Sequence, residues 1–174
     1  LHRFRGSSPA GGFVPGTQIE GTIDWERRYA HMRLHSGQHL LSALIFARTG
    51  QRTVRAVLRA PRATIELDTP LAPSEAPALQ ADLDRVYGED RPLRIRWVPR
   101  AEWERDRAGR SSGLRLAPEI DPVRLIEIVG LDACPCGGTH VRSTGEIRPA
   151  VVTPLPDAGN RWAISLMEAV SPTR

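Results

Sequence analysis

The sequence predicts an α+β fold in which two main helices pack on a mostly antiparallel sheet. Apolar residues recur at helical spacing over 27–48 and over 74–88, and a glycine, Gly50 or Gly88, stands where each helix is expected to end. The other apolar segments are short and strand-like. No internal repeat is found and no linker clearly divides the chain. We therefore expect one compact domain, or a main domain that carries a small lobe.

Each further element is predicted by a local residue pattern. Glycine, proline and serine mark a loop over 1–21 and the turns between strands, and Ser74 opens the second helix. The expected order is strand 18–25, helix 27–48, a hairpin of strands 53–58 and 63–67, helix 74–88, strand 93–98, short helix 102–107, polar loop 108–113, strand 123–129, a glycine-rich turn 130–140, and closing strands 147–153 and 162–167.

The composition is that of a globular protein. Of the 174 residues, 40% are hydrophobic and 25% are charged, which excludes wholesale disorder. The longest apolar run, 40–47, is well short of the roughly 20 residues that a membrane span requires. We expect a soluble protein with no membrane partner.

All 24 basic residues are arginine, and the net charge is +4. The planar guanidinium group pairs with phosphate and stacks on bases, which favours a nucleic-acid partner. The alternative is a base-composition bias of the genome, because acidic residues are interspersed and no long basic run exists.

Two groups of metal-ligand type are separated by about a hundred residues. His31, His35 and His39 are spaced four apart in the first expected helix, so each adjacent pair shares a face and can bind one ion. Cys136 and His140 lie on a glycine-rich turn. Taken alone, the histidines can form a polar helix face, and the cysteine can be a buried structural thiol. Together the two groups form a nitrogen and sulfur ligand set that favours Zn²⁺.

The two cysteines, Cys134 and Cys136, are separated by one proline, and neighbours this close rarely form a disulfide. No signal peptide is evident at the start of the sequence. We therefore expect a reducing, cytoplasmic setting, in which close cysteines and histidines indicate metal binding or catalysis.

The motifs HSGQHLLSA at 35–43, CGGTHV at 136–141 and STGEI at 143–147 closely resemble those of the free-standing alanyl-tRNA editing proteins, the AlaX family. They also resemble the editing domain of alanyl-tRNA synthetase. The resemblance covers about 18–168 and keeps both ligand motifs in order and separation. It implies a fold like the editing domain of threonyl- and alanyl-tRNA synthetases. A zinc-binding editing domain is then expected at 29–174, after a short and truncated β and loop region at 1–28.

The resemblance assigns the zinc ligands. His31 lies one helical turn before His35. It is expected to be exposed, or to contact a ligand side chain without binding the metal itself. Cys134 also falls outside the motif and is expected to be a bystander thiol, with a redox role or alternative ligation as the other interpretation. The residues that fall on the family's ligands are His35, His39, Cys136 and His140.

The family implies hydrolysis of the ester that joins a wrong amino acid, chiefly serine and secondarily glycine, to the acceptor end of alanine tRNA. Such editing is needed because a pocket for a small apolar side chain discriminates poorly against near-isosteres. Zinc can hold the amino or carbonyl group of the substrate, or can lower the pKa of a bound water, and the sequence leaves both open. Since four protein ligands close a structural zinc site, catalysis also needs a weak ligand, a fifth position or a separately positioned water.

Candidate substrate contacts lie close to the ligand motifs. The Thr139 hydroxyl can meet substrate, or it can stabilise the turn. Gln51 and Thr53, at the start of the strand after the metal-binding helix, can sense the hydroxyl of serine. For tRNA the candidates lie near the motifs in sequence or across the hairpin, and a solvated surface side chain is the alternative for each. They are Arg33, Arg52, Arg55, Arg59 and Arg142.

Two other functions stay open. One is a zinc-containing module that binds tRNA without turnover. The other is a related deacylase with a different aminoacyl or small-ester substrate. The glycine-glycine-threonine sequence of the 136–140 turn resembles the alanyl branch of the editing domains.

Overall fold

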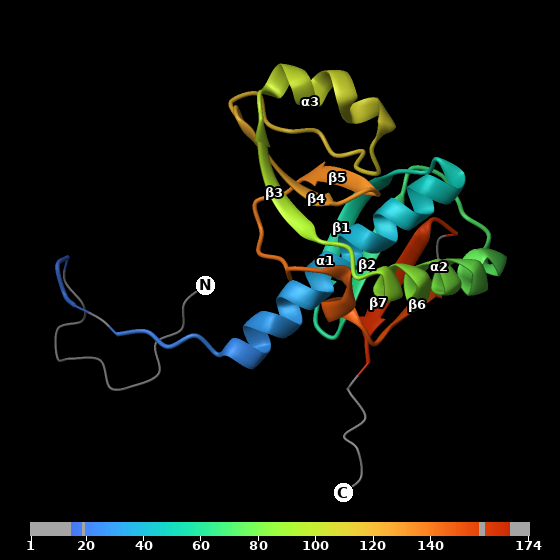
Figure 1. Cartoon of the computed structure of the whole chain (residues 1–174), viewed down its shortest axis with the longest axis horizontal. Helices are drawn as coiled ribbons and strands as arrows, with labels where there is room; N and C mark the ends of the chain where they lie inside the picture. The colour runs from blue at the N-terminus through green and yellow to red at the C-terminus, as the bar shows by residue number, and fades with distance from the viewer. Residues whose placement is uncertain (1–14, 19, 157–158, 168–174) are drawn as a thin grey trace, which may run out of the picture.

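The computed structural model describes residues 15–18, 20–156 and 159–167, and it confirms the α+β fold (Figure 1). Its helices are α1 (Trp25–Thr49), α2 (Ala76–Glu89) and α3 (Arg100–Asp106), with 3-10 turns at Pro73–Glu75, Arg107–Gly109 and Thr144–Ile147. Its strands are β1 (Thr53–Arg59), β2 (Arg62–Leu67), β3 (Leu93–Val98), β4 (Val123–Ile128), β5 (Asp132–Pro135), β6 (Ala150–Pro154) and β7 (Arg161–Leu166).

The strands form two sheets, where the sequence had indicated one. The larger sheet has the order β1-β2-β7-β6, and the smaller has the order β3-β4-β5. Neighbouring strands are antiparallel in both sheets. The last strand, β7, lies between β2 and β6, so the closing hairpin joins the sheet that the β1-β2 hairpin begins.

α1 is defined by caps at both ends. The Asp24 side chain accepts a hydrogen bond from the backbone N–H of Arg27 at 3.0 Å, which satisfies one of the free donors of the first turn. Gly50 ends the helix in the left-handed conformation, at φ 76°, and its N–H donates to the Phe46 carbonyl. The predicted helix is therefore confirmed, with a start two residues earlier than expected.

The main core lies between α1 and the larger sheet. Leu34, Leu41 and Ile45 of α1 are almost fully buried, as are Ile65 of β2 and Trp162 of β7. α2 packs beside α1 through the apolar face that its periodicity predicted. The first turns of α1 project beyond the sheet (Figure 1). Burial of a continuous apolar layer thus fixes the second half of α1, the half that carries the histidine motif.

The smaller sheet has its own core under α3. Trp103 of α3 is 2% exposed and packs with Val98, Val123, Leu125 and Ala133. The other face of this sheet turns toward α1, because Cys134 of β5 contacts His39. The smaller sheet therefore carries the cysteine motif to the histidine motif.

Two expectations for the elements were wrong. No strand is present at the described positions of 18–25: the backbone at 20–24 is irregular, and the capping by Asp24 starts the helix at Trp25. The earlier N-terminal positions, 1–14, lie outside the described residues. β5 was expected to be part of a glycine-rich turn, but its backbone pairs with β4.

None of the helices in the described part of the chain combines the length and the hydropathy that a bilayer crossing requires.

Candidate metal centre

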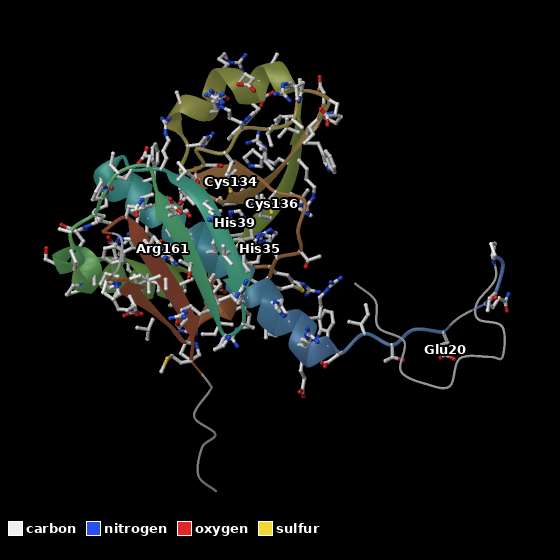
Figure 2. The ribbon with its side chains drawn as sticks, turned by 180° about the vertical axis from the view of Figure 1, so that it is seen from behind. Glu20, His35, His39, Cys134, Cys136 and Arg161 are labelled. Carbon is white, nitrogen blue, oxygen red and sulfur yellow. The ribbon has the colours of Figure 1, made fainter. Side chains whose placement is uncertain are left out.

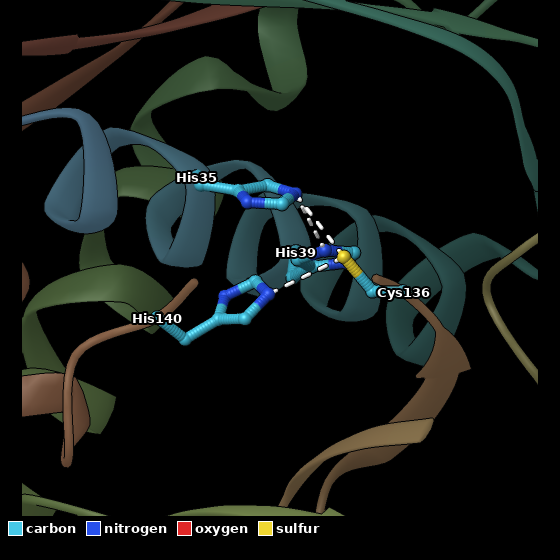
Figure 3. Close-up of side chains that lie close together, drawn as sticks. All are labelled: His35, His39, Cys136 and His140. Atoms are coloured by element: carbon cyan, nitrogen blue, oxygen red, sulfur yellow. Dashed lines mark hydrogen bonds between the residues drawn. The ribbon is translucent and has the colours of Figure 1, made fainter. Parts of the chain in front are cut away.

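Four side chains of metal-ligand type converge where α1 meets the turn after β5. His35 and His39 lie one turn apart on α1, and Cys136 and His140 follow β5 (Figure 2). Their potential ligand atoms all lie within 4.8 Å of one another (Figure 3). The structure therefore brings together the four residues that the family resemblance named. His31 is not part of this cluster.

Three separations within the cluster match those between the ligands of a single tetrahedral zinc ion. His35 Nε2 lies 3.2 Å from His39 Nε2 and 3.4 Å from Cys136 Sγ, and His140 Nε2 lies 3.3 Å from that Sγ. Zinc bonds of about 2.0–2.1 Å to nitrogen and about 2.3 Å to sulfur place neighbouring tetrahedral ligands about 3.3–3.6 Å apart. Three imidazoles and a thiolate are also a donor set that zinc prefers.

Each imidazole has a partner outside the cluster. His140 Nδ1 lies 3.2 Å from Ser36 Oγ, and His39 Nδ1 lies 2.9 Å from Cys134 Sγ. His35 hydrogen-bonds the backbone of Thr139. Such contacts fix the ring orientation and the tautomer of a histidine that binds metal. They show that the cluster is built to present its Nε2 atoms to one point.

Burial keeps the imidazoles neutral. Removal from water is the main cause that lowers the pKa of His35, of His39 and of His140, the last to about 3. A neutral imidazole has a free lone pair for a metal. Burial also raises the pKa of the Cys136 thiol, so metal binding would release its proton.

The turn needs a glycine at position 138. A Cβ at Gly138 would lie 2.7 Å from His35 Nδ1, closer than real side-chain atoms approach, whereas a Cβ at Gly137 would meet nothing within 4 Å. The N–H of Gly138 also donates to Cys136 Sγ at 3.3 Å. The CGGTH sequence therefore allows the turn to close over the His35 ring.

A small cavity of about 40 Å³ lies beside His39, and most of its surface is apolar. Thr53 Oγ1 donates to Ser42 Oγ at 2.7 Å, and Gln38 Nε2 donates to the same oxygen at 3.0 Å, so three lining side chains form one buried hydrogen-bonded chain. A cavity measured in this way needs about 10–15 Å³ to hold one water, so this one admits a group of only a few non-hydrogen atoms. The rest of its lining is Ala56, Ser111, Ser112, Leu114, Cys134 and Pro135.

The three candidate substrate contacts lie in different surroundings. Thr53 is 4% exposed and lines the cavity. Thr139 is exposed beside the metal ligand His140. Gln51 is not part of the cavity lining: its Nε2 donates to the carbonyls of Thr69 and Pro70, at 3.1 and 2.6 Å.

The five candidate arginines are not brought together. Arg33 donates to the backbone carbonyls of Glu146, Ile147 and Arg148, and this contact ties α1 to the turn after the ligands. Arg52 donates to the Ala108 carbonyl and lies over the Phe46 ring.

The other three are exposed. Arg55 and Arg59 lie on β1, and Arg142 follows the ligand turn. Hence two of the five already have intramolecular partners, whereas the guanidinium groups of the other three have none among the residues that the structure describes.

Sequence reasoning missed several residues that support the centre. Ser36 accepts from the Val141 N–H at 3.1 Å, in addition to its contact with His140. Arg124 donates to the Cys136 carbonyl, and its positive charge lowers the pKa of His35 and of His140. Cys134, expected to be a bystander, contacts His39. The sequence carried no signal for this contact, because Cys134 lies in a short strand, β5, that reads as part of a glycine-rich turn.

The fold and the site define an α+β domain of the synthetase editing type with a His₃Cys cluster. A family model described as the threonyl and alanyl tRNA synthetase second additional domain matches residues 123–166, which include Cys136 and His140.

The chain is 38% identical over 135 residues to alanyl-tRNA editing protein Aarsd1-B of Xenopus laevis, which covers 77% of this chain and 32% of that protein. It is 30% identical over 172 residues to alanyl-tRNA editing protein AlaX-M of Methanosarcina mazei, which covers 95% of this chain and 68% of the relative. It is also 30% identical to AlaX-M of Methanosarcina acetivorans, of which it covers 61%. The chain belongs to the alanyl-tRNA editing protein family. It spans about a third of the Aarsd1 relative and about two thirds of the AlaX-M relatives.

Proposed function

We propose that this chain is a zinc-dependent deacylase that hydrolyses the ester between serine and alanine tRNA, with glycine as a second amino acid. The observation that carries the proposal is the position of the four-ligand cluster directly beside a small cavity lined by hydroxyl and amide groups. The names of the relatives, alanyl-tRNA editing proteins, support the same substrate class.

The four side chains of the cluster differ in their burial. His39 is buried, whereas His35, Cys136 and His140 are half-buried, so substrate would approach past these three. Zinc bound there would polarise the ester carbonyl or lower the pKa of a water. Thr139 is exposed and directly precedes the ligand His140, so its hydroxyl would contact the aminoacyl group.

The cavity would provide the selectivity. Its size excludes large side chains, but size alone cannot reject alanine, which is smaller than serine. The buried chain of Gln38, Ser42 and Thr53 would hydrogen-bond the hydroxyl of serine. A site built to bind a hydroxyl leaves its polar groups unpaired when the hydroxyl is missing, and this loss disfavours alanine and also makes glycine a slower substrate than serine.

The direct test offers the purified protein alanine tRNA charged with serine, glycine or alanine, with and without a chelator. We expect rapid loss of the seryl ester, slower loss of the glycyl ester and little loss of the alanyl ester. Chelation should abolish the activity, and zinc should restore it. Cys136→Ala should behave like the chelated protein, with tRNA binding retained.

The other outcomes separate the alternatives. Binding without any hydrolysis above buffer would indicate a tRNA-binding module. Equal hydrolysis of the alanyl ester would contradict proofreading, and hydrolysis of simple seryl esters in preference to charged tRNA would indicate a small-ester hydrolase.

A further inference from the structure

The face of the larger sheet that points away from α1 carries an unusual concentration of arginine. Side chains alternate along a strand, so burial of Ala63, Ile65 and Leu67 of β2 against α1 turns the intervening residues outward. An open groove of about 400 Å³ lies on this outward face. Four arginines and one carboxylate line it: Arg55, Arg59, Arg62, Arg161 and Glu66.

The charges in the groove are not balanced within the protein. Four guanidinium groups and one carboxylate give a net charge of +3. Glu66 is the cross-strand neighbour of both Arg55 and Arg161. Within the described residues, no side-chain hydrogen bond or ion pair joins any of these five groups to another residue, although other arginines of the chain form ion pairs.

One pair of the arginines is arranged unfavourably for an isolated sheet. Arg59 and Arg62 are direct cross-strand partners at the end of the β1-β2 hairpin. Like charges directly opposite one another destabilise a sheet. Repulsion of this kind lowers the stability of the fold, and proteins carry such unfavourable arrangements mainly at functional sites. A ligand of opposite charge would relieve the repulsion.

The groove lies next to the candidate metal centre. Ala56 lines the cavity beside His39, and its neighbour in the chain, Arg55, lines the groove on the opposite face of β1. β1 is the edge strand of its sheet, and a register shift between Thr53 and Arg55 marks a bulge there. Thr53, at the start of β1, pairs with Ser111 and Gly113, so a polymer that crosses the edge of β1 beyond Thr53 can occupy both sites.

We propose that this groove binds the sugar–phosphate backbone of the RNA whose 3′ end enters the metal centre. Arg55 and Arg59 are four residues apart, about 13 Å along a strand, which is long enough to contact several successive phosphates. This inference rests on the proposed action on charged tRNA. It adds Arg62 and Arg161 to the RNA-binding surface and leaves out Arg33 and Arg52, which have partners within the protein.

The test compares two double variants of the full chain. Arg59→Gln with Arg62→Gln removes two charges from the groove. Arg28→Gln with Arg94→Gln removes two equally exposed arginines elsewhere, neither of which has a side-chain partner in the described part of the chain. The measured quantities are the Kd for uncharged alanine tRNA as a function of salt, and the KM and kcat for seryl-tRNA.

The groove variant should bind tRNA at least about tenfold more weakly, and its salt slope should fall by about one for each phosphate that the protein no longer neutralises. It should have a higher KM with little change in kcat, and it should hydrolyse a seryl ester of adenosine, which has no phosphate, at the rate of the unsubstituted protein. The control variant should resemble the unsubstituted protein in every assay. Equal Kd and salt slope in the two variants would overturn the inference.

The two proposals fail separately. If the unsubstituted protein hydrolyses no charged tRNA, the proposed function fails, while the binding and salt data still decide whether the groove holds RNA. A melting temperature of the groove variant that is equal to or higher than that of the unsubstituted protein would show that weaker binding is not due to unfolding.

Discussion

The Sγ of Cys134 lies 2.9 Å from Nδ1 of His39, on the side of the imidazole opposite the ligand cluster. Cys134 is buried, and burial raises the pKa of its thiol well above the usual range. The thiol is therefore neutral and can accept the Nδ1–H of a histidine that binds metal through Nε2. A contact of this kind acts on metal affinity through the orientation of the ring.

Replacement of Cys134 by alanine should therefore weaken metal binding without removing a ligand. When a metal-binding histidine loses the hydrogen-bond partner of its other ring nitrogen, the metal affinity falls by about 10–100-fold. Competition with a chromophoric chelator measures this effect directly. Cys134→Ser, which keeps an acceptor for the Nδ1–H, should recover most of the affinity. An unchanged affinity in Cys134→Ala would mean that packing alone orients His39.

The glycines of the turn provide a second, internally controlled experiment. Gly138→Ala places a Cβ against the His35 ring, so either the ring or the turn must move, and zinc affinity should fall by more than about tenfold. Gly137→Ala adds the same methyl group where nothing lies within 4 Å. This variant should bind zinc like the unsubstituted protein. Equal losses in both variants would indicate that the turn requires flexibility rather than space.

Local patterns in the sequence predicted the elements whose signals are local. The helix that carries His35 and His39 has apolar periodicity and a terminal Gly50, and the strand at 93–98 is bounded by turn residues at both ends. The structure has both. The family resemblance also named the four side chains that the fold brings together.

Contacts that depend on packing between distant elements could not be predicted in this way. β7 pairs with β6 through their hairpin, but its pairing with β2 is set by the shared core and not by any turn. The contact of Cys134 with His39 requires the smaller sheet to dock on α1, and Arg124 reaches Cys136 only through the pairing of β4 with β5. β5 itself is too short for its alternation to be distinguished from a turn.

Acid should destabilise the protein when it holds no metal. Burial lowers the pKa of His39 and lowers that of His140 to about 3, whereas both titrate near 6.5 in an unfolded chain. At a pH between the folded-state pKa and the unfolded-state pKa, the unfolded chain binds more protons than the folded protein. The free energy of unfolding therefore falls as the pH falls. For His140 the slope approaches about 1.4 kcal/mol per pH unit well below pH 6.5.

Urea unfolding of the chelated protein at several pH values from about 7 to about 5 measures this slope. His140→Gln should show a shallower dependence on pH, because one of the buried neutral groups is gone. A stability that does not change over this range would show that the histidines are protonated in the fold.

The hydroxyl of Thr53 should affect selectivity more than it affects catalysis. Thr53→Val keeps the shape of the side chain but removes the donor to Ser42, and it leaves a buried polar chain one partner short, at a cost of about 1–3 kcal/mol in unfolding free energy. If this chain binds the hydroxyl of serine, the value of kcat/KM for seryl-tRNA should fall about tenfold or more, while that for glycyl-tRNA should change little. Thr53→Ser keeps the donor and loses the methyl group, so it is the control for a change at this position that leaves the hydrogen bond to Ser42 in place. Parallel losses on both substrates would instead place the hydroxyl of serine elsewhere, and the exposed Thr139 would then be the next position to test, through Thr139→Val.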